Sequence, residues 1–281
     1  MIIFRNSTGL QSWREKQREN DRPVAFIPTM GALHEGHIQL IEASRAFTGL
    51  SICSIFINPA QFNNPSDFEK YPVSTENDIR MLDGISTDVL FLPSKEEIYP
   101  GGSTGLETYD LGSLENILEG KYRPGHFHGV CLIMNRLLKL IKPDHLLMGQ
   151  KDYQQCLVVQ KLISTLGISL NFHAIPTVRE SDGLAMSSRN RRLDPEQRRK
   201  APAIYRALKD IAVNIRPGST EPPLLQARRL LDAADFRTDY VSVARASDLE
   251  PVGIWDGKEK IVALIAAFLG EIRLIDNLPL N

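Results

Sequence analysis

The feature that most constrains this chain is a series of short, largely apolar runs that alternate with helical patterns. The runs lie at residues 24–28, 50–58, 88–93, 145–148 and 169–176. Apolar residues at helical spacing follow at 37–47, 129–141 and 154–166. Strands that are apolar throughout and alternate with helices predict a parallel sheet covered on both faces.

The character of the sequence changes near residue 177. A polar, charged stretch, "VRESDGLAMSSRNRRLDPEQRRKA", leads into helical patterns at about 195–215 and 224–234. Three strand-like runs follow, "DYVSVARA", "KIVALIAAFLG" and "EIRLIDNL", and the short turn at Gly270 favours antiparallel pairing. A chain of 281 residues has room for two domains. We therefore predict a parallel α/β domain over residues 1–177 and a smaller α+β domain over residues 178–281.

Composition excludes several classes of protein. The 33 basic and 34 acidic residues nearly cancel, which argues against a general binder of nucleic acid or membrane surfaces. Cys53, Cys131 and Cys156 are far apart in apolar runs and predict buried, reduced thiols. The first 20 residues do not resemble a signal peptide, and no run approaches the roughly 18 apolar residues of a membrane helix. We expect a cytoplasmic protein.

The stretch "PTMGALHEGH" joins the first apolar run to a helical pattern and contains His34 and His37. Zinc-binding histidines of a helical site lie four apart, whereas these lie three apart across a turn, so a zinc site is disfavoured. The N-terminus of a helix beginning near Gly36 offers free N–H groups to a phosphate, and Gly31 and Gly36 permit close approach. On spacing alone, a phosphate site and an ordinary strand-to-helix turn fit equally well.

Two further segments carry groups suited to anions. "GQKDYQQ" follows an apolar run, and in it Lys151 suits a phosphate, Asp152 suits a helix cap and Gln155 suits a substrate hydroxyl or carboxylate. "AMSSRN" offers hydroxyls and a guanidinium in a loop preceded by Gly183. Each segment alone also fits a plain loop.

A third loop, 56–72, crowds amide and aromatic side chains after a strand, and Phe56, Gln61 and Tyr71 in it suit a small polar substrate. Because the carboxyl ends of parallel strands lie at one edge, this loop, "PTMGALHEGH" and "GQKDYQQ" are expected on one rim. The basic residues near the domain boundary are interleaved with acidic ones, so a solvated face is favoured over an RNA site; they are Arg189, Arg191, Arg192, Arg198, Arg199 and Lys200.

Taken together, these segments resemble the pantothenate synthetase (pantoate–β-alanine ligase) family over nearly the whole chain. "PTMGALHEGH" is similar to the HIGH motif of class I aminoacyl-tRNA synthetases and nucleotidylyltransferases, and "AMSSRN" occupies the place of their KMSKS loop. "FINPAQF", "GHFHGV", "GQKDYQQ" and "VRESDGLAMSSRNRRL" match the family in order and spacing.

The resemblance implies a Rossmann-like N-terminal domain, a smaller C-terminal lid and a homodimer. It also implies a two-step ligation with ATP as co-substrate and Mg²⁺. Pantoate and ATP give an enzyme-bound pantoyl adenylate and pyrophosphate, and β-alanine then releases AMP and pantothenate. The expected partners are these small molecules, without nucleic acid or membrane.

The resemblance also carries residue roles to this chain. His34, His37, Lys151, Ser187, Ser188 and Arg189 are expected to be catalytic, with His37 as the family's proposed proton donor. Gln61 and Gln155 are expected to hold pantoate, and Asp78 lies where the family places an acid near magnesium. Arg123 and His126 match loop positions near the site. The expected ATP site comprises Met30, Gly31, Ala32, Leu33, His34, Glu35, Gly36, His37, Gly149, Gln150, Lys151, Asp152, Val178, Met186, Ser187, Ser188 and Arg189.

One departure is visible, because Gln150 stands where the family often has a glutamate before the lysine. Its loss removes a charge near the phosphates. Two other functions are alternatives. A nucleotidylyltransferase would share the histidine motif and keep the nucleotide on its product. A nucleotide-sensing or RNA-binding module without catalysis is disfavoured by the intact His34, His37, Lys151 and Ser187.

Overall fold

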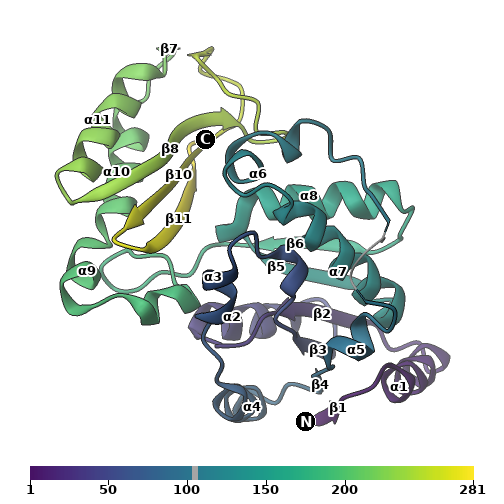
Figure 1. Cartoon of the computed structure of the whole chain (residues 1–281). Helices are drawn as coiled ribbons and strands as arrows, with labels where there is room; N and C mark the ends of the chain where they lie inside the picture. Colours follow the sequence, from purple (N-terminus) through teal and green to yellow (C-terminus); the bar gives the residue numbers. More distant parts are fainter. Residues whose placement is uncertain (103–106) are drawn as a thin grey trace.

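The apolar runs of the N-terminal part form one six-stranded parallel sheet in the computed structural model, which describes residues 1–102 and 107–281 (Figure 1). Five of the six strands are those predicted from the sequence. The strand order is β1-β4-β3-β2-β5-β6. The strands are β1 (Ile2–Phe4), β2 (Val24–Thr29), β3 (Leu50–Ile55), β4 (Val89–Phe91), β5 (His145–Gly149) and β6 (Asn171–Ile175).

Helices connect these strands and cover the sheet. The longer ones are α1 (Ser7–Glu19), α2 (Glu35–Ser44), α4 (Thr75–Gly84), α7 (His126–Ile141) and α8 (Tyr153–Thr165). Shorter helices and 3₁₀ turns complete the connections: η1 (Pro59–Gln61), α3 (Pro65–Glu69), α5 (Lys95–Ile98), η2 (Gly112–Glu115), α6 (Leu118–Tyr122) and η3 (Gln150–Asp152).

The sequence patterns missed the N-terminal elements β1 and α1. Strand β1 has three residues at the sheet edge, with Ile2 and Ile3 both exposed. In α1 only Leu10 and Arg14 are buried, so no apolar stripe marks its inner face.

The strand order reverses beside β2, whose two neighbours are β3 and β5. Pairing of β2 with β3 continues to Thr29, whereas pairing with β5 ends at Phe26. Pro28 lies beyond that point and has no N–H to donate. The two strands therefore part at their carboxyl ends, where open α/β sheets bind their ligands.

The C-terminal part contains a three-stranded antiparallel sheet of β8 (Phe236–Arg245), β10 (Ile261–Leu269) and β11 (Ile272–Pro279), as predicted. Helices α10 (Ala203–Asn214) and α11 (Glu221–Asp232) cover its outer face (Figure 1). Strand β10 is apolar on both faces because Ile261 and Ala263 join the core with these helices, whereas Val262 and Leu264 join the N-terminal core.

One predicted helix, at about 195–215, is wrong in its length. The structure divides it into α9 (Pro195–Lys200) and α10, because Pro202 cannot donate an intrahelical hydrogen bond. The remaining short elements are η4 (Ser188–Arg192), β7 (Gly218–Ser219) and β9 (Ile254–Trp255). The division at residue 178 stays a prediction. In the described part of the chain, no helix is both long and apolar enough to cross a membrane.

Candidate active site

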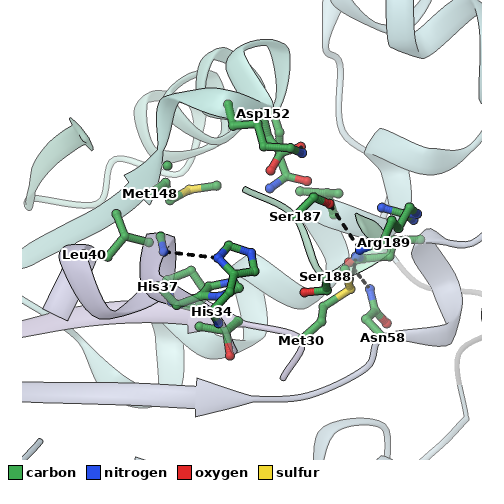
Figure 2. Close-up of a pocket in the computed structure, with 18 of the residues that line it drawn as sticks. Met30, His34, His37, Leu40, Asn58, Met148, Asp152, Ser187, Ser188 and Arg189 are labelled. Atoms are coloured by element: carbon green, nitrogen blue, oxygen red, sulfur yellow. Dashed lines mark hydrogen bonds and ion pairs between the residues drawn. The ribbon is translucent and has the colours of Figure 1, made fainter. Parts of the chain in front are cut away.

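A cavity of about 210 Å³ opens where β2 and β5 part. Its walls come from the loop after β2, the loop after β3, one face of α7, the loop after β5 and the segments 176–178 and 186–189. Figure 2 shows His34 and His37 on one side and Ser187, Ser188 and Arg189 on the other. Segments far apart in the sequence thus share one cavity.

The loop after β2 is held in an unusual backbone conformation. Gly31 and Ala32 have φ values of +77° and +49°, the left-handed region that a non-glycine residue rarely adopts. The buried carboxylate of Asp78 accepts hydrogen bonds from the N–H groups of Ala32 at 2.8 Å and Leu33 at 2.9 Å. The Ser74 hydroxyl donates a third hydrogen bond at 2.9 Å. Asp78 therefore fixes the turn that leads into the histidines.

His34 and His37 form a reciprocal cap at the start of α2. Nδ1 of His34 accepts from the N–H of Gly36 at 3.2 Å, and Nδ1 of His37 accepts from the N–H of His34 at 3.3 Å. A neutral imidazole that accepts at Nδ1 carries its hydrogen on Nε2. Both rings therefore have an N–H donor left for a ligand.

Electrostatics keep both histidines neutral. Burial, with the nearby charges of Lys151 and Arg191, lowers the pKa of His34 to about 2. Burial also lowers the pKa of His37 to about 4, although Asp152 and Asp78 oppose the shift. At neutral pH the rings act as neutral hydrogen-bond donors.

The loop after β5 places Lys151 and Asp152 on the cavity wall, and the first turn of α8 adds Gln155. Asn277 of β11 binds this loop by donating to the carbonyls of Gln150 and Lys151 at 2.9 and 2.8 Å. The alternative role of Asp152, a helix cap, is met in position but not in hydrogen bonding. Asp152 occupies the N-cap of α8 without a side-chain capping bond, and its carboxylate lies 3.6 Å from the Lys151 amine.

The segment that carries the two serines and Arg189 docks on the histidine loop. The Ser188 hydroxyl donates to the carbonyl of Ala32 at 3.0 Å, and Arg191 donates to that of Leu33 at 2.8 Å. Arg189 lies above the Tyr71 ring, 5.8 Å from its centroid, and pairs with Asp67 at 2.8 Å. The segment 186–191 thereby closes one wall of the cavity.

The inner part of the cavity combines apolar and amide groups. Val130, Ile133, Met134 and Leu137 of α7 contribute apolar side chains. Gln61 lies on η1, which packs so closely on α7 that a Cβ at Gly129 would lie 2.1 Å from the Ala60 carbonyl oxygen.

Three polar groups hold this inner part in place. The Gln61 carbonyl contacts Nδ1 of His126 at 2.8 Å. Asn58 donates to the Gly129 carbonyl at 2.9 Å and accepts from the Tyr99 hydroxyl. The sequence motifs indicate no role for Asn58 or Asp67, although Asn58 lies within "FINPAQF".

Most expected site residues line this cavity, but not all. Those that do are Met30, His34, Gly36, His37, Gln61, Gly149, Lys151, Asp152, Gln155, Val178, Met186, Ser187, Ser188 and Arg189, together with Arg123 and His126. Those that do not are Gly31, Ala32, Leu33, Glu35, Gln150 and Asp78. Gly31, Ala32 and Leu33 shape the turn, whereas Glu35 contacts Gln39 on the surface.

The expected magnesium role of Asp78 stays a prediction, and the surroundings of this carboxylate favour another role. Asp78 is 1% exposed, and both of its oxygens already accept hydrogen bonds from the protein. The structure gives this carboxylate a supporting role under the loop. The basic residues near the boundary likewise contact the chain itself: Arg192 pairs with Asp67, Arg198 with Asp182, and Lys200 with Glu196 and Asp235.

The strand order and the histidine turn at the switch point define a Rossmann-like nucleotide-binding protein. The family model of pantoate–β-alanine ligase matches residues 2–279. The chain therefore belongs to the pantoate–β-alanine ligase family.

Individual relatives agree with the family model. A pantothenate synthetase of Thioalkalivibrio sulfidiphilus is 41% identical over 98% of this chain and 95% of its own length. The crystal structure of pantothenate synthetase from Thermus thermophilus has a TM-score of 0.92 at 38% identity, covering 100% of this chain and 99% of that one. A pantoate–β-alanine ligase from Francisella tularensis, complexed with β-γ ATP and β-alanine, has a TM-score of 0.85 at 34% identity, covering 99% and 97%.

Proposed function

We propose that this protein condenses pantoate with β-alanine in two steps driven by ATP. A carboxylate oxygen of pantoate attacks the α-phosphorus, the bond from that phosphorus to the β-phosphate oxygen breaks, and pyrophosphate leaves. The amine of β-alanine then attacks the acyl carbon of pantoyl adenylate and loses a proton. The bond from that carbon to the phosphate oxygen breaks, and AMP and pantothenate are released.

The observation that carries the proposal is that phosphate-binding groups and a pocket for a small acid share one cavity. The Nε2–H groups of His34 and His37 and the Lys151 amine would face the phosphates, with Ser187, Ser188 and Arg189 opposite. Gln61 and Gln155 would bind the polar groups of pantoate, whose branched carbon body fits the apolar wall of α7.

The chemistry needs positioning and charge stabilisation rather than a nucleophilic side chain. All three cysteines are buried, and none of them borders the cavity in the described part of the chain. Burial raises the pKa of Cys53 and Cys131 to about 12, so these thiols stay protonated. Direct attack by the substrate carboxylate is therefore the step that this site favours.

A magnesium ion fits this site through Asp152, the one carboxylate among the described residues that line the cavity. Magnesium bound with nucleotides takes one or two carboxylates, and the phosphates and water supply its other ligands. When bound, the ion would neutralise phosphate charge. The chain's own part is to orient those phosphates with His34, His37 and Lys151.

The test is an assay of AMP formation. We expect AMP only when pantoate, β-alanine and ATP are all present. Sustained turnover without β-alanine, or ADP as the product, would refute the ligase. A stable nucleotidylated product that accumulates with pyrophosphate would instead identify a nucleotidylyltransferase.

The expected homodimer and cytoplasmic location belong to the same proposal. Exposed Ile2 and Ile3 on edge strand β1 offer apolar surface for a second copy, and the three cysteines are free, as is usual in a reducing compartment. Sedimentation equilibrium at twice the chain mass of 31.5 kDa is the expected result for the dimer.

A further inference from the structure

A second cavity, of about 510 Å³, lies between α3, α6 and the three-stranded sheet. It shares part of its wall with the catalytic cavity, namely Arg123, Lys151, Asp152, Ser187 and Arg189. Among the described residues, its lining has seven lysines and arginines against five aspartates and glutamates, so its net charge is positive. A cavity of this charge beside a phosphate site favours an anion.

Ion pairs close this cavity on two sides. On one side Arg273 of β11 pairs with Glu119 at 2.7 Å and with Asp239 at 2.8 Å. On the other side Asp67 of α3 pairs with Arg189 and Arg192, each at 2.8 Å. These pairs connect the N-terminal helices α3 and α6 to the C-terminal part. They leave a charged compartment directly outside the catalytic cavity.

Asp67 lines the second cavity and pairs with Arg189, which lines both cavities. Burial works to raise the pKa of Asp67, but hydrogen bonds from Arg189 and Arg192 outweigh it and lower that pKa. One carboxylate thus neutralises two guanidiniums, one of which, Arg189, faces both cavities. Arg189 therefore borders the catalytic cavity and Arg192 borders the second cavity, and the two arginines share one carboxylate.

Arg237 provides a further cation on the far wall. It is exposed and stacks on the Phe268 ring, with 4.3 Å between the guanidinium carbon and the ring centroid. Within residues 1–102 and 107–281 no carboxylate lies within ion-pair distance of it. Stacking on an aromatic face holds the guanidinium in place while its N–H groups stay available.

We propose that this interdomain cavity holds the inorganic diphosphate that leaves the catalytic cavity, with Arg192 and Arg237 as its contacts there. The proposal rests on the proposed function, since adenylation is the step that releases diphosphate. An ion held in the second cavity is separated from the α-phosphorus and must return before it can react. The cavity therefore opposes reversal of adenylation while β-alanine approaches the acyl carbon.

The test is exchange of labelled inorganic pyrophosphate into ATP, with pantoate present and β-alanine omitted. In Arg237→Gln we expect the half-saturating pyrophosphate concentration to rise about fivefold, the size of one exposed charge-assisted contact. The half-saturating ATP concentration stays unchanged. The maximal exchange rate does not fall, because the lost contact belongs to the holding position rather than the reacting one. Arg237→Lys, which keeps the charge, recovers part of the effect.

Two more variants make the test specific. Arg192→Gln should act in the same direction as Arg237→Gln, with thermal unfolding recorded because its pair with Asp67 is also lost. Arg198→Gln is the matched control: it removes a lid arginine that pairs with Asp182 and lines neither cavity. It should leave the pyrophosphate dependence unchanged.

The outcomes separate the two proposals. If the wild type exchanges label but Arg237→Gln and Arg192→Gln show the wild-type pyrophosphate dependence, the cavity proposal is wrong and the ligase stands. A parallel rise in half-saturating ATP also overturns it, because the arginines would then belong to the ATP site. If the wild type shows no exchange at all, the adenylate intermediate itself is refuted.

Discussion

Replacing Asp78 with asparagine separates the two roles considered for this residue. The carboxylate is 1% exposed and accepts three hydrogen bonds, from Ala32, Leu33 and Ser74, at 2.8 to 2.9 Å. Asparagine keeps one acceptor oxygen and places an amide N–H₂ opposite at least one of these donors. Hydrogen bonds to a charged group contribute about 1.5–3 kcal/mol each, so we expect a loss of about 3 kcal/mol in unfolding free energy.

This loss has two measurable consequences. With roughly 2–4 °C per kcal/mol for domains of 150–250 residues, the Tm should fall by about 6–12 °C. Because the turn at Gly31 and Ala32 positions His34 and His37, kcat/KM should also fall, by about a hundredfold for a displacement near 1 Å. The magnesium concentration for half-maximal activity should not change.

The control is Asp83→Asn on the same helix, since Asp83 is exposed and its carboxylate, among the described residues, pairs only with the N-terminal amine, at 3.4 Å. Its effect should stay within about 0.5 kcal/mol. A Tm for Asp78→Asn equal to that of the wild type, combined with a tenfold higher magnesium requirement, would show that Asp78 binds the metal and that the loop-anchor argument is wrong.

Three further predictions follow from the site. His37→Ala should lower the adenylation rate about a hundredfold in single-turnover kinetics, because the Nε2–H donates to charge that grows in the transition state. ATP affinity, measured by ATP binding, should fall less. A loss of ATP affinity without a loss of the adenylation rate would contradict this prediction. Gly129→Ala should lower the free energy of unfolding, measured in urea, by about 1–3 kcal/mol, because its Cβ displaces η1 and with it Gln61. Gly84→Ala, whose Cβ has open space around it, should leave that free energy nearly unchanged. Burial lowers the pKa of His126 to about 3, so the unfolded chain binds more protons than the folded one below about pH 6.5. The free energy of unfolding should therefore fall as pH falls from 6.5 toward 3, by up to about 1.4 kcal/mol per pH unit. His126→Gln should reduce this slope between pH 6.5 and 5, and an unchanged slope would show that other groups cause it.

The sequence was most informative where local pattern and burial agree. Strands β2 to β5 are largely apolar and mostly buried because helices cover both faces of the sheet, so their hydrophobicity alone indicated a parallel sheet. Edge strand β6 has no buried residue and gave a weaker signal. Elements with few buried groups, such as α1, gave no such signal. Pro202 shows where a sequence pattern overestimates the length of a helix. The helical pattern continues across Pro202, but the helical hydrogen bonds are interrupted there.

By itself the sequence determined the class of fold and the motifs that carry the chemistry, because apolar periodicity and residue type are local properties. Only the tertiary structure decided which side chains meet. It brought Ser188 to the Ala32 carbonyl across 156 positions, turned both histidines to leave Nε2–H groups free, and buried Asp78 beneath the loop. These facts depend on strand order and on packing between distant segments, and no residue type or spacing along the chain specifies them.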